Sequence, residues 1–187
     1  MTLTEMKAWL DENGIEYKEE TYSYSGEMKE PETPSFFSRL FAVEPLYKSG
    51  KELIIESKNG KRNLELSFGR DNTNYIFTLM MFGNYLFDID EEDFNIEEAA
   101  ELVRSVIQGN KKFICEYGED FADDDISDND ECFDMADPKE RDAFHRKVDR
   151  IRNVNQGMLN KVIKFLYQVP KKYEIYDWNT YECIVRE

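Results

Sequence analysis

The sequence predicts one α+β domain over residues 1–187, with a central antiparallel sheet, helices packed on it, a long C-terminal helix and a terminal hairpin. Short alternating apolar segments follow one another between residues 52 and 89, which is typical of an antiparallel meander. Two longer segments, 95–108 and 138–169, repeat apolar residues at three- and four-residue steps, as amphipathic helices do. A chain of 187 residues is long enough for one sizeable core but short for two domains.

The N-terminus predicts a short helix followed by an extended segment. Thr2 and Glu5 have the spacing of a capping box, and Gly14 stands where a C-terminal cap belongs. The extended segment follows at 15–24, and a loop is expected at 25–35, where two prolines interrupt a charged stretch.

The central sheet is predicted from four strand-like segments and the turns between them. The first, 52–57, leads into Asn59-Gly60, which is a strong hairpin signal. In the second, 64–68, apolar and polar residues alternate, so one side faces a core and the other faces water. The third, 75–82, is apolar on both sides, as in a central strand, and a turn connects it to the fourth, 85–89.

Two helices are predicted after the sheet. Asn95 is the N-cap of the first, which ends near Gly109 and should cover one face of the sheet with its apolar side. Pro138 stands at the first position of the second, whose apolar stripe continues to about Val169. This long helix is basic, because 139–172 contains ten lysines and arginines against three acidic residues.

The remaining segments are a strand at 112–117, a terminal hairpin with strands at 173–176 and 181–185, and an acidic loop at 118–137. The acidic loop holds ten carboxylates and no lysine or arginine. The repulsion between so many charges of the same sign disfavours a packed helix or strand here. Two interpretations of it stay open. It either docks on the basic helix of the same molecule or presents its carboxylates to a partner.

The charge balance limits the classes of partner. Forty aspartates and glutamates against 24 lysines and arginines give a formal charge of −16. General attraction to nucleic acid or to an anionic membrane is therefore disfavoured, and a charge-steered partner should be basic. No apolar run has the length of a signal peptide or a membrane span, and three widely spaced cysteines fit reduced thiols, so a cytoplasmic location is expected.

The leading interpretation of the sequence includes no catalytic residues, no cofactor and no metal. His145 is the single histidine, which excludes sites that need two. Asp88 and Asp90 are two residues apart, so their side chains project from the same side of a strand end. Paired carboxylates in this arrangement can hold a divalent metal for phosphoryl or nucleotidyl transfer. The Gly-Ser turn that accompanies such a pair in nucleotidyltransferases is missing. A metal-dependent phosphoryl- or nucleotidyl-transfer enzyme that uses Asp88 and Asp90 is therefore kept as the alternative and not as the leading hypothesis.

The leading hypothesis is a non-enzymatic acidic binding module that inhibits or neutralises a basic protein, such as a nuclease or a nucleic-acid-binding protein. Immunity proteins against toxins and inhibitors that mimic DNA are of this type. The negative charge favours it, as do 13 Phe, 11 Tyr and 2 Trp, since aromatic residues make good interface anchors. The residues expected to bind the partner are carboxylates of the acidic loop: Asp123, Asp124, Asp125, Asp128, Asp130 and Glu131.

Overall fold

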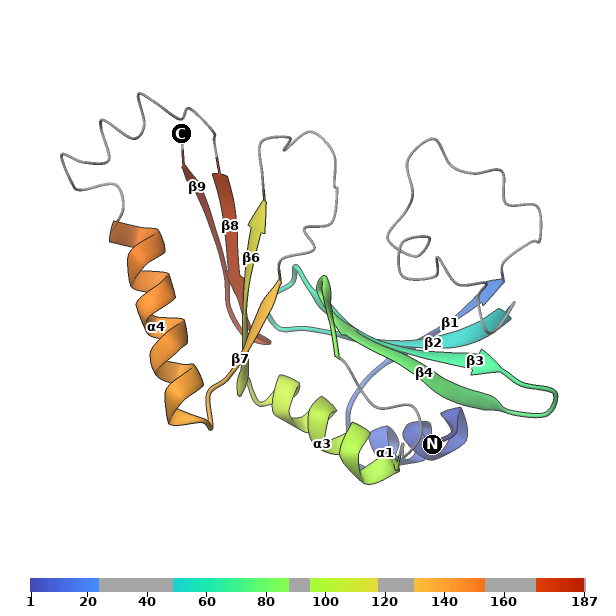
Figure 1. Ribbon diagram of the computed structural model, residues 1–187. Helices are drawn as coiled ribbons and strands as arrows, with labels where there is room; N and C mark the ends of the chain where they lie inside the picture. Colours follow the sequence, from blue (N-terminus) through green and yellow to red (C-terminus); the bar gives the residue numbers. More distant parts are fainter. Residues whose placement is uncertain (24–48, 88–94, 118–129, 154–170, 187) are drawn as a thin grey trace. The chain divides into compact units, whose positions relative to one another are not determined.

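The computed structural model describes five stretches of the chain, residues 1–23, 49–87, 95–117, 130–153 and 171–186 (Figure 1). The chain divides into two compact units, Met1–Val103 (unit one) and Arg104–Glu187 (unit two). Each unit holds one antiparallel sheet and helical segments, so the predicted α+β class is confirmed. The single domain over the whole chain stays a prediction.

Unit one is built on a five-stranded sheet in which neighbours along the chain are also neighbours in space. Its strands are β1 (Lys18–Ser23), β2 (Ser49–Glu56), β3 (Asn63–Arg70), β4 (Tyr75–Phe82) and β5 (Tyr85–Leu86). They pair antiparallel in the order β1-β2-β3-β4-β5. The predicted meander is therefore confirmed, and the segment predicted only as extended joins it as the edge strand β1 (Figure 1).

The turn between β2 and β3 follows the hairpin signal of the sequence. The Asn59 side-chain oxygen accepts hydrogen bonds from the backbone N–H groups of Lys61 at 2.7 Å and Arg62 at 3.0 Å. Gly60 has a φ of +67°, a left-handed conformation that is accessible to glycine at little cost. The asparagine side chain and the glycine together reverse the chain.

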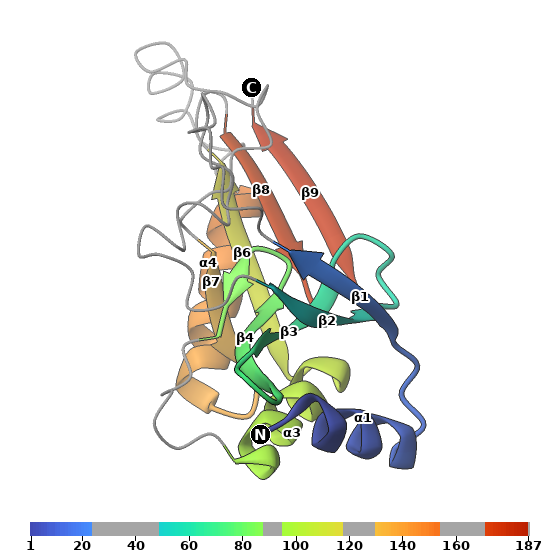
Figure 2. The ribbon, with the colours of Figure 1, turned by 90° about the vertical axis from the view of Figure 1, so that its right-hand side faces the viewer.

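One face of this sheet carries helices. α1 (Leu3–Glu12) and the first part of α3 (Ile96–Ile107) lie side by side on it (Figures 1 and 2). The predicted capping box is present, because the Thr2 hydroxyl accepts from the Glu5 N–H while Glu5 accepts from the Thr2 N–H at 2.7 Å. Buried apolar residues of the helices and strands form the core of unit one: Met6, Leu10, Leu53, Ile55, Leu64, Leu66, Phe68, Met80, Phe82, Ala99 and Val103.

Unit two is built on a four-stranded antiparallel sheet. Its strands are β6 (Lys111–Tyr117), β7 (Glu131–Asp134), β8 (Lys171–Tyr176) and β9 (Tyr181–Arg186). They pair in the order β7-β6-β8-β9, so β6 and β8 lie in the middle. The predicted strand after the first long helix and the predicted terminal hairpin are both confirmed.

The helix α4 (Pro138–Asn153) packs on one face of this second sheet. Its N-terminus is capped by Asp137, whose side chain accepts a hydrogen bond from the backbone N–H of Lys139 at 2.7 Å. The helix and the sheet share one hydrophobic core, formed by Phe144, Val148, Ile151, Ile114, Tyr173 and Ile175. Phe133 of β7 packs against this core, with its ring centroid 5.6 Å from that of Phe144.

Two predicted elements differ from the structure or extend past its described ranges. A loop is predicted over 118–137, but Glu131–Asp134 form the strand β7 by pairing with β6. The many carboxylates around this strand make the sequence resemble a loop. Pairing with β6 and the contact of Phe133 with the core stabilise the strand. The long helix predicted to reach Val169 is present as far as Asn153, and 154–170 lie outside the described residues.

The helices in the described ranges have 10, 12 and 16 residues. None of them combines the length and the apolar character needed to cross a membrane.

Candidate partner-binding surfaces

Most residues selected from the sequence lie outside the described ranges. This applies to four of the predicted partner-binding carboxylates, Asp123, Asp124, Asp125 and Asp128. It also applies to Asp88 and Asp90, the pair of the enzymatic alternative. The structure therefore places two of the selected residues, Asp130 and Glu131.

Asp130 and Glu131 lie at the start of β7 and are both engaged within unit two. The Tyr176 hydroxyl donates a hydrogen bond to Asp130 Oδ2 at 2.7 Å. The Lys147 ammonium nitrogen, on the basic helix α4, lies 2.5 Å from Glu131 Oε1. At this end of the acidic segment, the contacts support docking within the molecule, and for 118–129 both interpretations stay open.

Asp134, at the end of β7, is held in the same way. Lys111 Nζ lies 2.9 Å from Asp134 Oδ2, and this hydrogen bond lowers the pKa of the Asp134 carboxyl. The backbone N–H of Asp134 donates to Glu140 Oε2 on α4 at 2.6 Å. Polar contacts with Lys111 of β6 and Glu140 of α4 therefore hold the end of the acidic segment where the chain leads into α4.

The ion pair between Glu131 and Lys147 is expected to contribute little to stability. Replacing Glu131 with Gln should lower the free energy of unfolding by about 0.5 kcal/mol, because the Glu131 side chain is 53% exposed and water screens the pair. Urea unfolding of E131Q, K147Q and the double variant measures the coupling between the two residues. A coupling of about 2 kcal/mol or more would contradict this expectation and assign the carboxylate a structural role.

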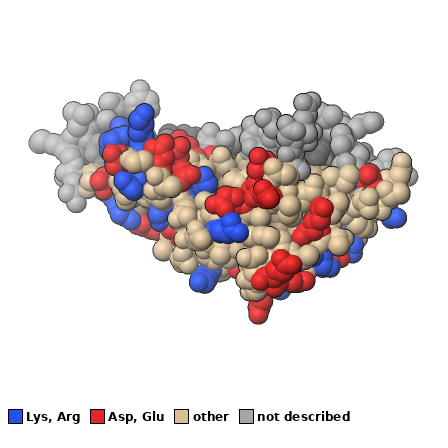
Figure 3. All heavy atoms as spheres, turned by 90° about the horizontal axis from the view of Figure 1, so that it is seen from below, with Lys and Arg blue, Asp and Glu red and all other residues tan. Residues whose placement is uncertain are grey.

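The outward faces of α1 and α3 form a second acidic region, which we call the acidic helical surface. Its exposed carboxylates are Glu5, Asp11, Glu12, Glu97, Glu98 and Glu101. Figure 3 looks at the molecule from below and shows groups of acidic side chains on this side, with basic side chains beside them. Both helices are anchored by buried apolar residues, such as Met6 on α1 and Val103 on α3, so the carboxylates stand on a firm support.

Local interactions keep this surface negatively charged. Hydrogen bonds from the backbone and side chain of Thr2 lower the pKa of Glu5. Glu97 and Glu98 lie in the first turn of α3, where the helix dipole stabilises negative charge. The surface therefore attracts cationic groups at neutral pH.

Sequence reasoning identified the components of the acidic helical surface but not the surface. The helical period places Glu97, Glu98 and Glu101 opposite the apolar face of the predicted helix. The period cannot show that α1, from a distant part of the chain, lies beside α3. In the sequence, the charge of 118–137 is concentrated in one segment, whereas the charges of the acidic helical surface are spread over two distant helices.

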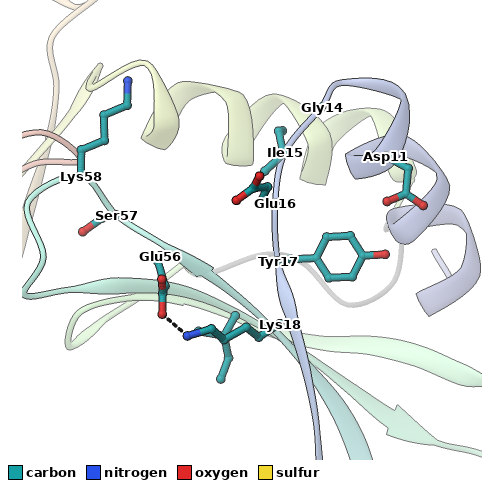
Figure 4. Close-up of a pocket in the computed structure, with 10 residues that line it drawn as sticks. Asp11, Gly14, Ile15, Glu16, Tyr17, Lys18, Glu56, Ser57 and Lys58 are labelled. Atoms are coloured by element: carbon teal, nitrogen blue, oxygen red, sulfur yellow. Dashed lines mark hydrogen bonds and ion pairs between the residues drawn. The ribbon is translucent and has the colours of Figure 1, made fainter.

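A groove of about 1060 Å³ opens in unit one, where the segment after α1 diverges from the end of β2 (Figure 4). Ile15 and Ile54 supply apolar lining, and carboxylates and lysines surround them. Asp11 belongs both to this groove and to the acidic helical surface, so the two features are continuous.

The polar side chains of the groove are arranged in pairs. Lys18 forms an ion pair with Glu56, which neutralises one charge of each sign (Figure 4). The Tyr17 hydroxyl points toward Asp11, and burial followed by the charge of that carboxylate raises the pKa of Tyr17 (Figure 4). Carboxylates next to an aromatic ring and apolar side chains suit contacts with a basic side chain that has an aliphatic stem.

The described residues contain no group of three or more His, Cys, Asp or Glu side chains that could hold a metal ion. Comparison of the chain with protein-family models, with curated proteins and with solved structures finds no match.

Proposed function

We propose that this chain is a non-enzymatic protein-binding module that inhibits or neutralises a basic partner, in the manner of an immunity protein or a DNA-mimic inhibitor. The acidic helical surface carries this proposal, because it presents carboxylates from two anchored helices on one side of unit one. Such a surface attracts a basic protein over a distance of about one Debye length and favours its orientation before contact.

The groove adds a place for closer contact. Tyr17 offers an aromatic ring on the side of the Asp11 carboxylate, and Glu16 lines the groove on the other side of the segment (Figure 4). Arginine and lysine combine a charged head with an apolar stem, so a partner side chain of this type matches both parts of the lining. A nuclease or a nucleic-acid-binding protein presents such side chains on the surface that binds phosphates.

The proposal includes a cytoplasmic location. All three cysteines, Cys115, Cys132 and Cys183, are free thiols in the structure. Burial raises the pKa of Cys132 to about 12, so this thiol stays protonated and unreactive. Free thiols are the usual state of cysteine in a reducing compartment.

Neutralising the acidic helical surface should weaken partner binding. In the test variant, Glu12 and Glu97 are replaced with Gln. In the matched control, Asp142 and Asp149 on α4 are replaced with Asn, which removes the same charge from exposed helical positions of unit two. Affinity capture from the source cells identifies basic binders of the unmodified protein, and the association rate of the purified binder is then measured with each variant.

The test variant is expected to reduce the association rate by about three- to tenfold at low salt, with the control close to the unmodified protein. Equal rates for both variants would place the binding site elsewhere. Capture of no basic protein by the unmodified chain would overturn the proposed function.

A further inference from the structure

The face of the five-stranded sheet opposite the helices carries a row of three glutamates. Glu20 of β1 stands directly opposite Glu52 of β2 in the antiparallel register. Glu65 of β3 is opposite Ile54 and therefore diagonal to Glu52 on the same face. We call these three side chains the carboxylate row.

The carboxylate row has little compensation from the described residues. The other polar or charged side chains that β1, β2 and β3 place on this face are Lys18, Tyr22, Glu56, Asn63 and Ser67. The residues of β4 in register with this face are uncharged: Ile76, Leu79 and Met81. Lys18 is paired with Glu56, and the Ser67 hydroxyl donates to Glu52 Oε1 at 3.0 Å. No described cation forms an ion pair with Glu65.

The carboxylate row acts on how firmly the edge strand β1 is attached to the sheet. β1 is the edge strand, pairs only with β2 among the described strands, and is almost entirely exposed. On its other face, Glu19 pairs with Lys7 at 2.7 Å and with Lys51 at 2.9 Å, which holds the strand from that side. On the row side, Glu20 and Glu52 face each other, and like charges directly across a sheet are destabilising.

We propose that the carboxylate row is a pH-sensitive catch for the edge strand β1, which holds the strand while Glu65 is protonated and loosens it when Glu65 ionises. Protonation of Glu65 removes the negative charge that β3 places in this half-buried row. Ionisation leaves three carboxylates on neighbouring strands and adds repulsion between Glu65 on β3 and the carboxylates of Glu52 and Glu20, of which Glu20 lies on the edge strand β1. This device goes beyond the proposed binding function and does not depend on it.

The direction of the pH dependence follows from the burial of Glu65. Burial, followed by the charges of Glu52 and Glu20, raises the pKa of Glu65 from 4.5 to about 7. Burial likewise raises the pKa of Glu52. A group whose pKa is higher in the folded state contributes stability that is complete below its unfolded pKa and is lost as the pH rises through the folded pKa. The strand should therefore loosen between about pH 5 and pH 8.

Amide hydrogen exchange of the full chain tests the catch. After correction for the intrinsic rates, the protection of β1 amides in the unmodified protein should fall about tenfold between pH 5.5 and pH 8. In E65Q the fall should be much smaller, because the amide at this position cannot ionise. The matched control E97Q, with an exposed glutamate of α3 neutralised, should behave as the unmodified protein does.

A carboxyl-carbon NMR titration provides a second readout. The Glu65 signal should titrate near pH 7, and in E52Q its midpoint should shift downward because a neighbouring like charge is gone. A midpoint near 4.5 overturns the proposal, as does β1 protection that is equal at the two pH values. If E65Q does not fold, the unmodified protein and E52Q decide the outcome.

Discussion

Replacing Gly50 with Ala is expected to disrupt the pairing of β2 with β3 and to cost about 3 kcal/mol in the free energy of unfolding. Gly50 lies in β2 opposite Tyr22, and an added Cβ would come closer than 3.0 Å to the Tyr22 ring and to the backbone carbonyl of Phe68. The tyrosine can rotate away, but the carbonyl belongs to a fully buried residue of β3 and cannot. Either the strand pair opens or the register changes.

Urea unfolding, together with hydrogen exchange of the β2 and β3 amides, measures this effect. The neighbouring S49A is the control, since it shortens a side chain without adding an atom at the crowded position. The double variant Y22A/G50A should recover only part of the loss, because the contact with the Phe68 carbonyl remains. A G50A protein as stable as the unmodified chain would show that β2 and β3 do not approach as closely as described at Gly50.

Replacing Asp177 with Ala should have the other large effect. Asp177 is 4% exposed, and its side chain accepts hydrogen bonds from the backbone N–H groups of Asn179 and Thr180, both at 2.8 Å. It also forms an ion pair with Lys112, a neighbour of the Phe144 ring on α4. Alanine would leave two turn amides and a partly buried ammonium without this acceptor, at an expected cost of about 2–4 kcal/mol.

The pKa of Asp177 predicts how the stability of unit two changes at acidic pH. Burial alone would raise the pKa of Asp177, but hydrogen bonds from Lys112 and from the Asn179 and Thr180 amides outweigh it and lower the pKa. The stabilisation is therefore present above the unfolded value of about 3.8 and is lost as the pH falls through the lower folded value.

The control for D177A is D177N, which keeps an oxygen for the turn amides and loses only the charge. D177N should be more stable than D177A at pH 7, and its stability should depend less on pH below about 4 than that of the unmodified protein. Urea unfolding at the two pH values measures both quantities. Equal stability of D177A and the unmodified protein would contradict the role of this side chain as the anchor of the turn.

The predictable part of the fold consists of features that are encoded locally. Asn59-Gly60, the Thr2–Glu5 capping box and the Asp137 cap act through side chains within a few residues of one another, so spacing alone reveals them. The strand at 75–82 is predictable because its signal, a continuous apolar run, is also local. These local signals define where elements begin and end.

The features that could not be predicted depend on contacts between distant segments. The strand β7 exists because β6 pairs with it and Phe133 reaches the core under α4, and neither partner is visible in its four residues. The division into two units falls at Val103, inside α3, where no linker marks it. The candidate site follows the same rule, since the groove and the acidic helical surface each join α1 to segments far along the chain.

The central claim is that charge on this chain captures a basic protein, and the salt dependence of the association rate tests it most directly. For the purified basic partner, the account predicts that the association rate falls at least about tenfold from roughly 50 to 500 mM salt, while the dissociation rate changes much less. An association rate that stays constant over this range would contradict the claim.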